Sequence, residues 1–149
     1  MCKKAHGTSA RPVMDDLRFG CDFKTADRIC SFNRHYAEYA GYAWRPSITW
    51  VAELTKNVNQ EITHYDSVTG KPLFIAPRGR TTKDLLVESE AHGWPSFRDG
   101  EVVWENVRCL ADGECVSVDG THLGHNLPDS KGNRYCINLV CIAGNPKIE

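Results

Sequence analysis

The sequence lacks a long apolar run, a marked excess of either charge and any Cys-x-x-Cys pair. No stretch approaches the roughly 20 apolar residues of a membrane-spanning helix, so we expect no membrane partner. The formal net charge of -1 gives no electrostatic reason to expect nucleic acid as a partner. The first residues lack the apolar centre of a secretory signal, which favours a cytoplasmic location, although an organelle location is also compatible with the sequence.

The number and spacing of the cysteines do not indicate a set of disulfide pairs. Their number is odd, and they are Cys2, Cys21, Cys30, Cys109, Cys115, Cys136 and Cys141. This argues against a fully paired secreted disulfide framework and against a four-cysteine zinc site. Free thiols in a reducing compartment are the ordinary interpretation, and a catalytic thiol is the more specific one.

The residue patterns divide the chain near residue 60. Residues 1–14 have the pattern of a loose tail, 15–44 of irregular structure and 47–56 of a helix capped by Ser47. Further on, the patterns predict a hairpin over 62–75, a helix over 82–91, strands over 102–110 and 115–118, and a last strand over 135–143. We therefore expect an extension of residues 1–60, with short helices, that wraps a compact β domain of residues 61–149.

The most informative cysteine is Cys136, which begins an apolar segment directly after a turn-prone stretch. Arg134 and the histidines His122 and His125 could stabilise its thiolate, the reactive form of cysteine. The alternative is a small buried hydrophobic residue, which is the more common role of a cysteine in a strand. Spacing alone favours this second interpretation.

His122 and His125 are bracketed by Gly120 and Gly124, a pattern typical of a tight loop. The two imidazoles could bind a metal, but alone they make an incomplete zinc site. They could also supply a general acid near neutral pH, or lie in a surface loop with neither role. The choice depends on whether Cys136 lies nearby in space.

Trp94 belongs to the segment Gly93-Trp-Pro-Ser-Phe97, which follows the predicted helix. A tryptophan in such a position is most often a core anchor. Its ring can also pack against an S-methyl group, because sulfur–aromatic contacts are favourable.

Together these segments resemble the B-type methionine sulfoxide reductases, which reduce the R epimer of methionine sulfoxide. The resemblance covers about residues 62–144 and includes Gly70-Lys-Pro-Leu-Phe74, Gly93-Trp-Pro-Ser-Phe97, Val107-Arg-Cys109, His122-Leu-Gly-His125, Pro128-Asp129 and Arg134-Tyr-Cys-Ile-Asn138. Each segment is weak alone, whereas their number and order make the combination specific. The resemblance implies a mainly β (α+β) fold with twisted antiparallel sheets.

The resemblance also implies residue roles. The catalytic set would be Cys136 as nucleophile, His122 and His125 as imidazoles that bind and protonate the sulfoxide oxygen, and Asn138 as a polar neighbour. The substrate-binding set would be Trp94 as the wall for the methyl group, Phe97, Arg134 and Asp129.

The implied reaction is thiol-dependent reduction of methionine-R-sulfoxide, either free or in oxidised proteins. Cys136 would attack the sulfoxide sulfur and become a sulfenic acid. A second thiol would then form a disulfide, which thioredoxin or a similar thiol reductant would open by exchange.

The chain departs from the family pattern at the usual zinc ligands. Asp66 and Thr69 replace the first cysteine pair, and only Cys109 remains of the second, so we expect no structural zinc and no other cofactor. Asn106 replaces a family glutamate, with Glu105 adjacent.

His92 stands where a common resolving cysteine lies. The candidates for the resolving thiol are therefore Cys115, Cys30, Cys21 and Cys2, whereas we expect Cys141 in the core.

Two alternatives to an enzyme are also compatible with the sequence, the first because both the zinc ligands and the usual resolving cysteine are missing. The first is a catalytically impaired module that keeps the fold and binds oxidised or apolar peptides. The second is a domain that binds a metal through His122 and His125.

Overall fold

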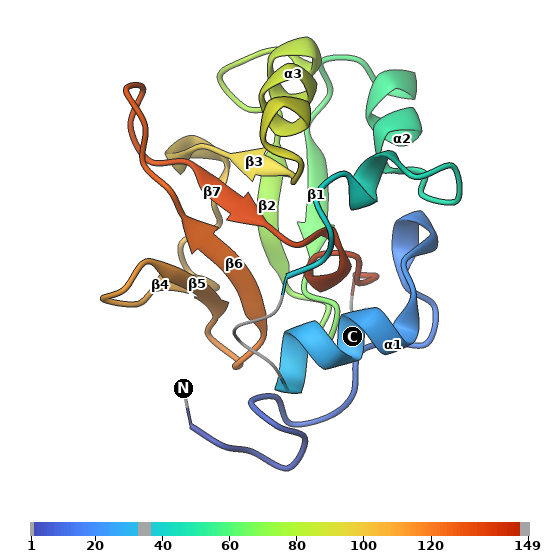
Figure 1. Cartoon of the computed structure of the whole chain (residues 1–149), viewed down its shortest axis with the longest axis vertical. Coiled ribbons are helices and arrows are strands. Elements are labelled where there is room, and N and C mark those ends of the chain that lie inside the picture. The colour runs from blue at the N-terminus through green and yellow to red at the C-terminus, as the bar shows by residue number, and fades with distance from the viewer. Residues whose placement is uncertain (1, 33–36, 147–149) are drawn as a thin grey trace.

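The computed structural model describes residues 2–32 and 37–146, which form two antiparallel sheets and a few short helices (Figure 1). The five-stranded sheet has the order β3-β7-β6-β5-β4, and the two-stranded sheet pairs β1 with β2. Its strands are β3 (Ser96–Phe97), β4 (Val107–Cys109), β5 (Glu114–Ser117), β6 (His122–Asn126) and β7 (Tyr135–Ile137), and those of the smaller sheet are β1 (Ile62–Tyr65) and β2 (Pro72–Ala76). The expected mainly β (α+β) class is confirmed.

The helices lie at the edges of the sheets. Helices α2 (Trp50–Lys56) and α3 (Thr82–His92) lie at one end of the molecule, and α1 (Phe23–Asp27) lies at the other end (Figure 1). The described residues also form single turns at Arg18–Gly20, Arg28–Phe32, Tyr42–Trp44, Asp99–Glu101 and Leu139–Cys141. In the described part of the chain, no helix has the length and apolar character to cross a membrane.

Two predicted elements are confirmed by their local chemistry. The β1–β2 hairpin pairs Thr63 with Ile75. Helix α3 begins with a capping box, in which the Thr81 side chain accepts from the Asp84 N–H and the Asp84 carboxylate accepts from the Thr81 N–H. It ends at Gly93, whose φ of +87° lies in the left-handed region that glycine adopts at little cost.

Other predicted boundaries are wrong. Helix α2 begins at Trp50, after Thr49, rather than at Ser47. The strand expected over 102–110 is limited to β4, because residues 103–106 form a turn in which the Asn106 N–H donates to the Val103 carbonyl over 3.0 Å. The strand expected over 135–143 ends at Ile137 and continues as a 3-10 turn.

Residues 2–14 form ordered structure rather than the expected loose tail. Ser9 is fully buried, and its hydroxyl lies 2.8 Å from that of Ser31. The Thr8 hydroxyl donates to the Gly120 carbonyl over 2.7 Å, which ties this segment to the turn before β6. These contacts use polar groups and backbone, so no apolar periodicity announces them.

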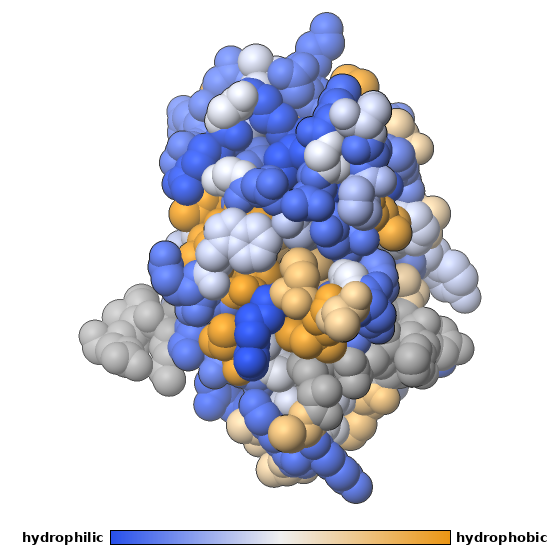
Figure 2. Space-filling view, turned by 90° about the vertical axis from the view of Figure 1, so that its left-hand side faces the viewer, coloured by the Kyte–Doolittle hydropathy of each residue, from blue (hydrophilic) through white to orange (hydrophobic). Residues whose placement is uncertain are grey.

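The hydrophobic core includes side chains from both parts of the sequence. Ile29, Trp50 and Leu54 belong to the same buried cluster as Phe74 and Leu123. The Trp50 indole N–H donates to His64 Nε2 over 3.0 Å, which satisfies both polar groups inside the core. The outer surface is mostly hydrophilic, with hydrophobic side chains gathered across the middle of the face in Figure 2.

Candidate active site

Cys136 lies in the middle of β7, between β3 and β6. It pairs with Ser96 on one side and with His125 on the other, and its side chain is half-buried. The next pairing joins His125 to Glu114 of β5. Residues that pair directly across antiparallel strands share a face, so Glu114, His125 and Cys136 form one row across the sheet.

Arg134 supplies the positive charge beside Cys136. Its side chain is only 8 % exposed, its Nη1 lies 3.5 Å from the Ser96 hydroxyl, and its Nε lies 3.9 Å from Asp129 Oδ2. Burial raises the pKa of the Cys136 thiol, the Arg134 guanidinium lowers it, and the Glu38 charge raises it again, with a net increase. The thiol therefore keeps its proton near neutral pH, and Arg134 limits the cost of ionising it.

Replacing Arg134 with methionine should shift the pH profile of Cys136 alkylation to higher pH. The guanidinium stabilises the thiolate, and methionine keeps much of the apolar stem without the charge. The measurement is the iodoacetamide alkylation rate of the Cys136 peptide, followed by mass spectrometry over a pH series. Arg11→Met, at an exposed site, is the control and should leave the profile in place.

His122 is held by a carboxylate on the neighbouring strand. It is 5 % exposed, and its Nδ1 lies 2.8 Å from Oε2 of Glu114. His122 pairs with Val116, two residues after Glu114 in β5, across a register shift between β5 and β6, so it lies on the face of the row that includes Cys136. A carboxylate partner fixes the ring orientation and stabilises the imidazolium.

His125 is directed to the turn between β4 and β5. Its Nε2 lies 2.8 Å from the Asp112 carbonyl oxygen. A carbonyl only accepts, so this nitrogen carries the proton and donates it to the turn. The two histidines therefore have different partners and different orientations, and His122 is the better candidate for proton transfer.

Trp94 and Asn138 meet at Glu38, a residue that the sequence patterns missed. The Trp94 indole N–H donates to the Glu38 carbonyl oxygen over 3.0 Å. The Glu38 backbone N–H donates to Asn138 Oδ1 over 2.9 Å, and Asn138 Nδ2 donates to the Leu123 carbonyl over 3.1 Å. A lone glutamate outside any motif gives no sequence signal for such a role.

The remaining predicted substrate-binding residues, Phe97 and Asp129, have structural partners away from Cys136. Phe97 is fully buried and stacks on Phe74 with ring centroids 4.5 Å apart, which makes it a core residue. Asp129 lies on an exposed turn and binds Arg98 through Oδ1 at 3.0 Å and Oδ2 at 2.9 Å. These bonds to Arg98 lower the pKa of Asp129 to about 2.

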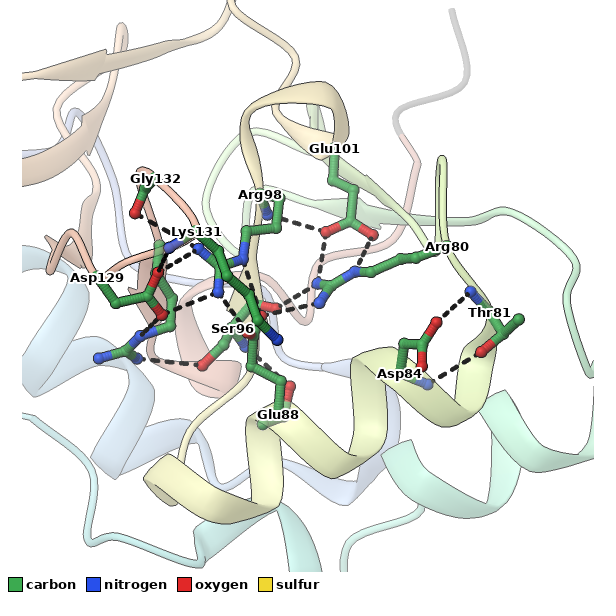
Figure 3. Close-up of polar contacts among 12 residues, drawn as sticks. Arg80, Thr81, Asp84, Glu88, Ser96, Arg98, Glu101, Asp129, Lys131 and Gly132 are labelled. Atoms are coloured by element: carbon green, nitrogen blue, oxygen red, sulfur yellow. Dashed lines mark hydrogen bonds and ion pairs between the residues drawn. The ribbon is translucent and has the colours of Figure 1, made fainter.

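A network of ion pairs supports the edge of the sheet next to Cys136 (Figure 3). The fully buried Glu101 binds the Arg80 side chain at 2.7 and 3.1 Å, and Glu88 binds both Arg80 and Arg98. Arg80 also donates to the Ser96 carbonyl over 2.8 Å. The network thus connects α3 and the Asp99–Glu101 turn to β3, the strand that pairs with Cys136. Sequence patterns did not reveal it, because its members come from separate segments.

Cys115 lies on the other face of the sheet from Cys136. It pairs with Gly124, which in turn pairs with Ile137, so it is one residue out of phase with the Cys136 row. Its Sγ lies 3.5 Å from that of the exposed Cys109. Burial and the neighbouring Cys109 raise the pKa of the Cys115 thiol.

Cys30 faces Cys141 in the core, with their Sγ atoms 2.8 Å apart and both side chains fully buried. The expectation of Cys141 in the core is therefore confirmed. Burial raises the pKa of both thiols and that of Cys21, which is partly buried. Cys2 is exposed. Cys136 has no sulfur neighbour comparable to either pair among the described contacts.

Asp66 stands at one of the positions where the resemblance to the reductase family would place a zinc ligand. It is fully buried and accepts from the Thr121 hydroxyl at 2.9 Å and from the Val68 N–H at 2.8 Å. These bonds join the β1–β2 turn to the turn before β6 without a metal. Over residues 2–32 and 37–146, no three His, Cys, Asp or Glu side chains are grouped to hold a metal ion.

The chain matches no protein-family model and no curated protein. The functional proposal therefore depends on the residues around Cys136 and on their geometry.

Proposed function

We propose that the protein reduces methionine-R-sulfoxide, free or in oxidised proteins, with Cys136 as the nucleophile. The observation that carries this proposal is the position of the Cys136 thiol beside the buried guanidinium of Arg134, in the same row as the Glu114 that binds His122. A half-buried thiol beside a cation, with histidines on the neighbouring strand, suits attack on an electrophilic sulfur. Trp94 and Asn138, joined through Glu38, would supply the wall for the methyl group and a polar group near it.

The first step transfers one oxygen atom. The Cys136 sulfur attacks the sulfoxide sulfur, the oxygen passes to Cys136, and methionine leaves as a thioether. Cys136 is oxidised by two electrons to the sulfenic acid, and the substrate sulfur is reduced by two. The thiol proton ends on the transferred oxygen. The step therefore balances when Cys136 starts as the protonated thiol, which its raised pKa favours. His122 would pass this proton, with Glu114 stabilising the charged ring.

The second step needs another thiol. A thiol condenses with the sulfenic acid, which releases water and forms a disulfide, and a thioredoxin-like dithiol reduces that disulfide by exchange. Cys115 faces away from Cys136, and Cys30 is buried against Cys141, so either would require a change of conformation. Direct attack by the external reductant would need neither of these two changes.

The test is reduction of dabsylated methionine sulfoxide with dithiothreitol, with the two epimers followed separately. The proposal expects turnover of the R epimer and little of the S epimer, because only one places its methyl group on the wall while its oxygen faces the proton donor. Equal turnover of both epimers, or none of either, would contradict it.

A second candidate function is a module that binds oxidised or apolar peptides without turnover. The raised pKa of Cys136 and the orientation of Cys115 away from it favour this alternative. A single turnover per protein molecule in the presence of thioredoxin would support it, whereas sustained turnover would exclude it. A metal site at the two histidines is less compatible with the geometry, because His122 and His125 are directed to different partners.

A further inference from the structure

Glu38 makes four hydrogen bonds around the end of β7, and its side chain is buried. Its carboxylate accepts from the Leu139 N–H over 2.8 Å and from the Val140 N–H over 3.1 Å. Its backbone N–H and carbonyl bind Asn138 and Trp94. One residue from the N-terminal part of the chain therefore joins two residues of the proposed site to the turn that follows Cys136.

The side chain and the backbone of Glu38 have separate tasks in this arrangement. The carboxylate fixes the chain segment that carries Glu38 to the first N–H groups of the Leu139–Cys141 turn. Once the segment is fixed, its backbone holds the Trp94 ring and the Asn138 amide in single orientations. Both carboxyl oxygens of Glu38 accept from backbone N–H groups, so the carboxyl is the anchor. A charged acceptor forms stronger bonds to N–H groups than a neutral one, so the anchor is strongest above the Glu38 pKa of about 8, where the carboxyl is ionised.

We propose that Glu38 is a positioning residue of the active site, which holds Trp94 and Asn138 in place around Cys136. This inference rests on the proposed function for its kinetic consequence only. It assigns a role to the N-terminal extension, which lies outside the segments that resemble the reductase family.

The charge of Glu38 also raises the pKa of the nearby thiols. Burial raises the pKa of Glu38 to about 8, against the opposing effects of the bonds from Leu139 and Val140 and of the Arg45 charge. The carboxyl is therefore ionised when Cys136 titrates, and its charge raises the pKa of that thiol. Among the described residues, the other charged or titratable groups near Glu38 are Cys21, Cys30, Tyr42 and Cys141. Arg28 and Arg45 line a cavity of about 170 Å³ together with Glu38.

Two substitutions separate the anchor from the charge. Glu38→Ala removes both, and we expect kcat/KM for the R epimer to fall about 100-fold, because small misplacements of positioning groups have effects of this order. Glu38→Gln keeps a side-chain acceptor and removes the charge. It should recover much of that loss and shift the pH profile of Cys136 alkylation to lower pH. Glu90→Gln, at an exposed position of α3, is the matched control and should change neither.

A readout without turnover separates this inference from the proposed function. The Trp94 indole N–H, which the Glu38 carbonyl accepts, should exchange with solvent faster in Glu38→Ala than in the wild type when followed by NMR. If the wild type reduces neither epimer, the proposed function fails, whereas faster exchange and the shifted alkylation profile still support the positioning role. If Glu38→Ala does not fold, the alkylation profile and indole exchange of Glu38→Gln decide. If the folded variants match the wild type in kinetics, in the alkylation profile of Cys136 and in the exchange of the Trp94 indole N–H, the inference is overturned.

Discussion

Replacing Cys136 with serine should lower turnover of methionine-R-sulfoxide by about a thousandfold or more, which is typical of the loss of a catalytic nucleophile. A serine hydroxyl at this position has no comparable nucleophilicity, and the Arg134 charge is too weak to ionise it. The measurement is steady-state reduction of the R epimer with dithiothreitol as the only reductant.

Cys109→Ser is the matched control, because Cys109 is exposed and its partner Cys115 faces away from Cys136. With a small-molecule reductant, this variant should turn over at the wild-type rate. If Cys136→Ser kept its activity while Cys109→Ser lost it, the nucleophile would be wrongly assigned.

Replacing Glu101 with alanine should destabilise the fold by about 3–5 kcal/mol, the usual cost of removing one partner from a buried ion pair. Glu101 is fully buried and accepts from the backbone N–H groups of Arg78 and Arg98 at 3.0 and 2.9 Å, as well as from the Arg80 side chain. Its loss leaves the Arg80 guanidinium without its closest counter-charge. The measurement is the free energy of unfolding from denaturant titration.

Glu61→Gln provides the control for this prediction. Glu61 binds Arg78 on the surface at 3.1 Å, where solvent screens the pair, so the unfolding midpoint should not change measurably. Equal destabilisation by the two substitutions would show that the Glu101 network has no special role in the fold.

The sequence predicted elements whose signals are local. Helix α3 has its cap at Thr81 and its left-handed glycine at Gly93, and the β1–β2 hairpin has alternating residues on both sides of a turn. The strand predicted over 135–143 is too long because residues 139–143, which form a turn and its continuation, are fully buried and apolar like a core strand. A continuous apolar run does not distinguish a strand from a buried turn, so periodicity could not show where β7 ends.

The resemblance names residues for the candidate site but not the contacts that connect them. Cys136, His122, Trp94 and Asn138 were expected from their segments, whereas Glu38 and Glu114 were not. Glu38 reaches Leu139 across a separation of 101 positions in the chain. Contacts of this kind depend on the folded topology and leave no pattern in a single sequence.

The register of β5, β6 and β7 determines which side chains share a face of the sheet, which the spacing in the sequence does not show. A shift of one residue along a strand moves a side chain to the other face of the sheet. This phase separates Cys115 from Cys136, although Cys115 was a candidate partner by position. A register shift between β5 and β6 pairs His122 with Val116, which places His122 on the same face as Glu114 and Cys136.

The most direct test of the central claim is to identify the oxidised residue after one equivalent of methionine-R-sulfoxide reacts with the fully reduced protein. Dimedone, which traps sulfenic acids, would be present during the reaction, and peptides would be mapped by mass spectrometry. The proposed mechanism predicts a dimedone adduct or a disulfide at Cys136, together with one equivalent of methionine. Release of methionine with Cys136 unmodified, or no release of methionine, would contradict it.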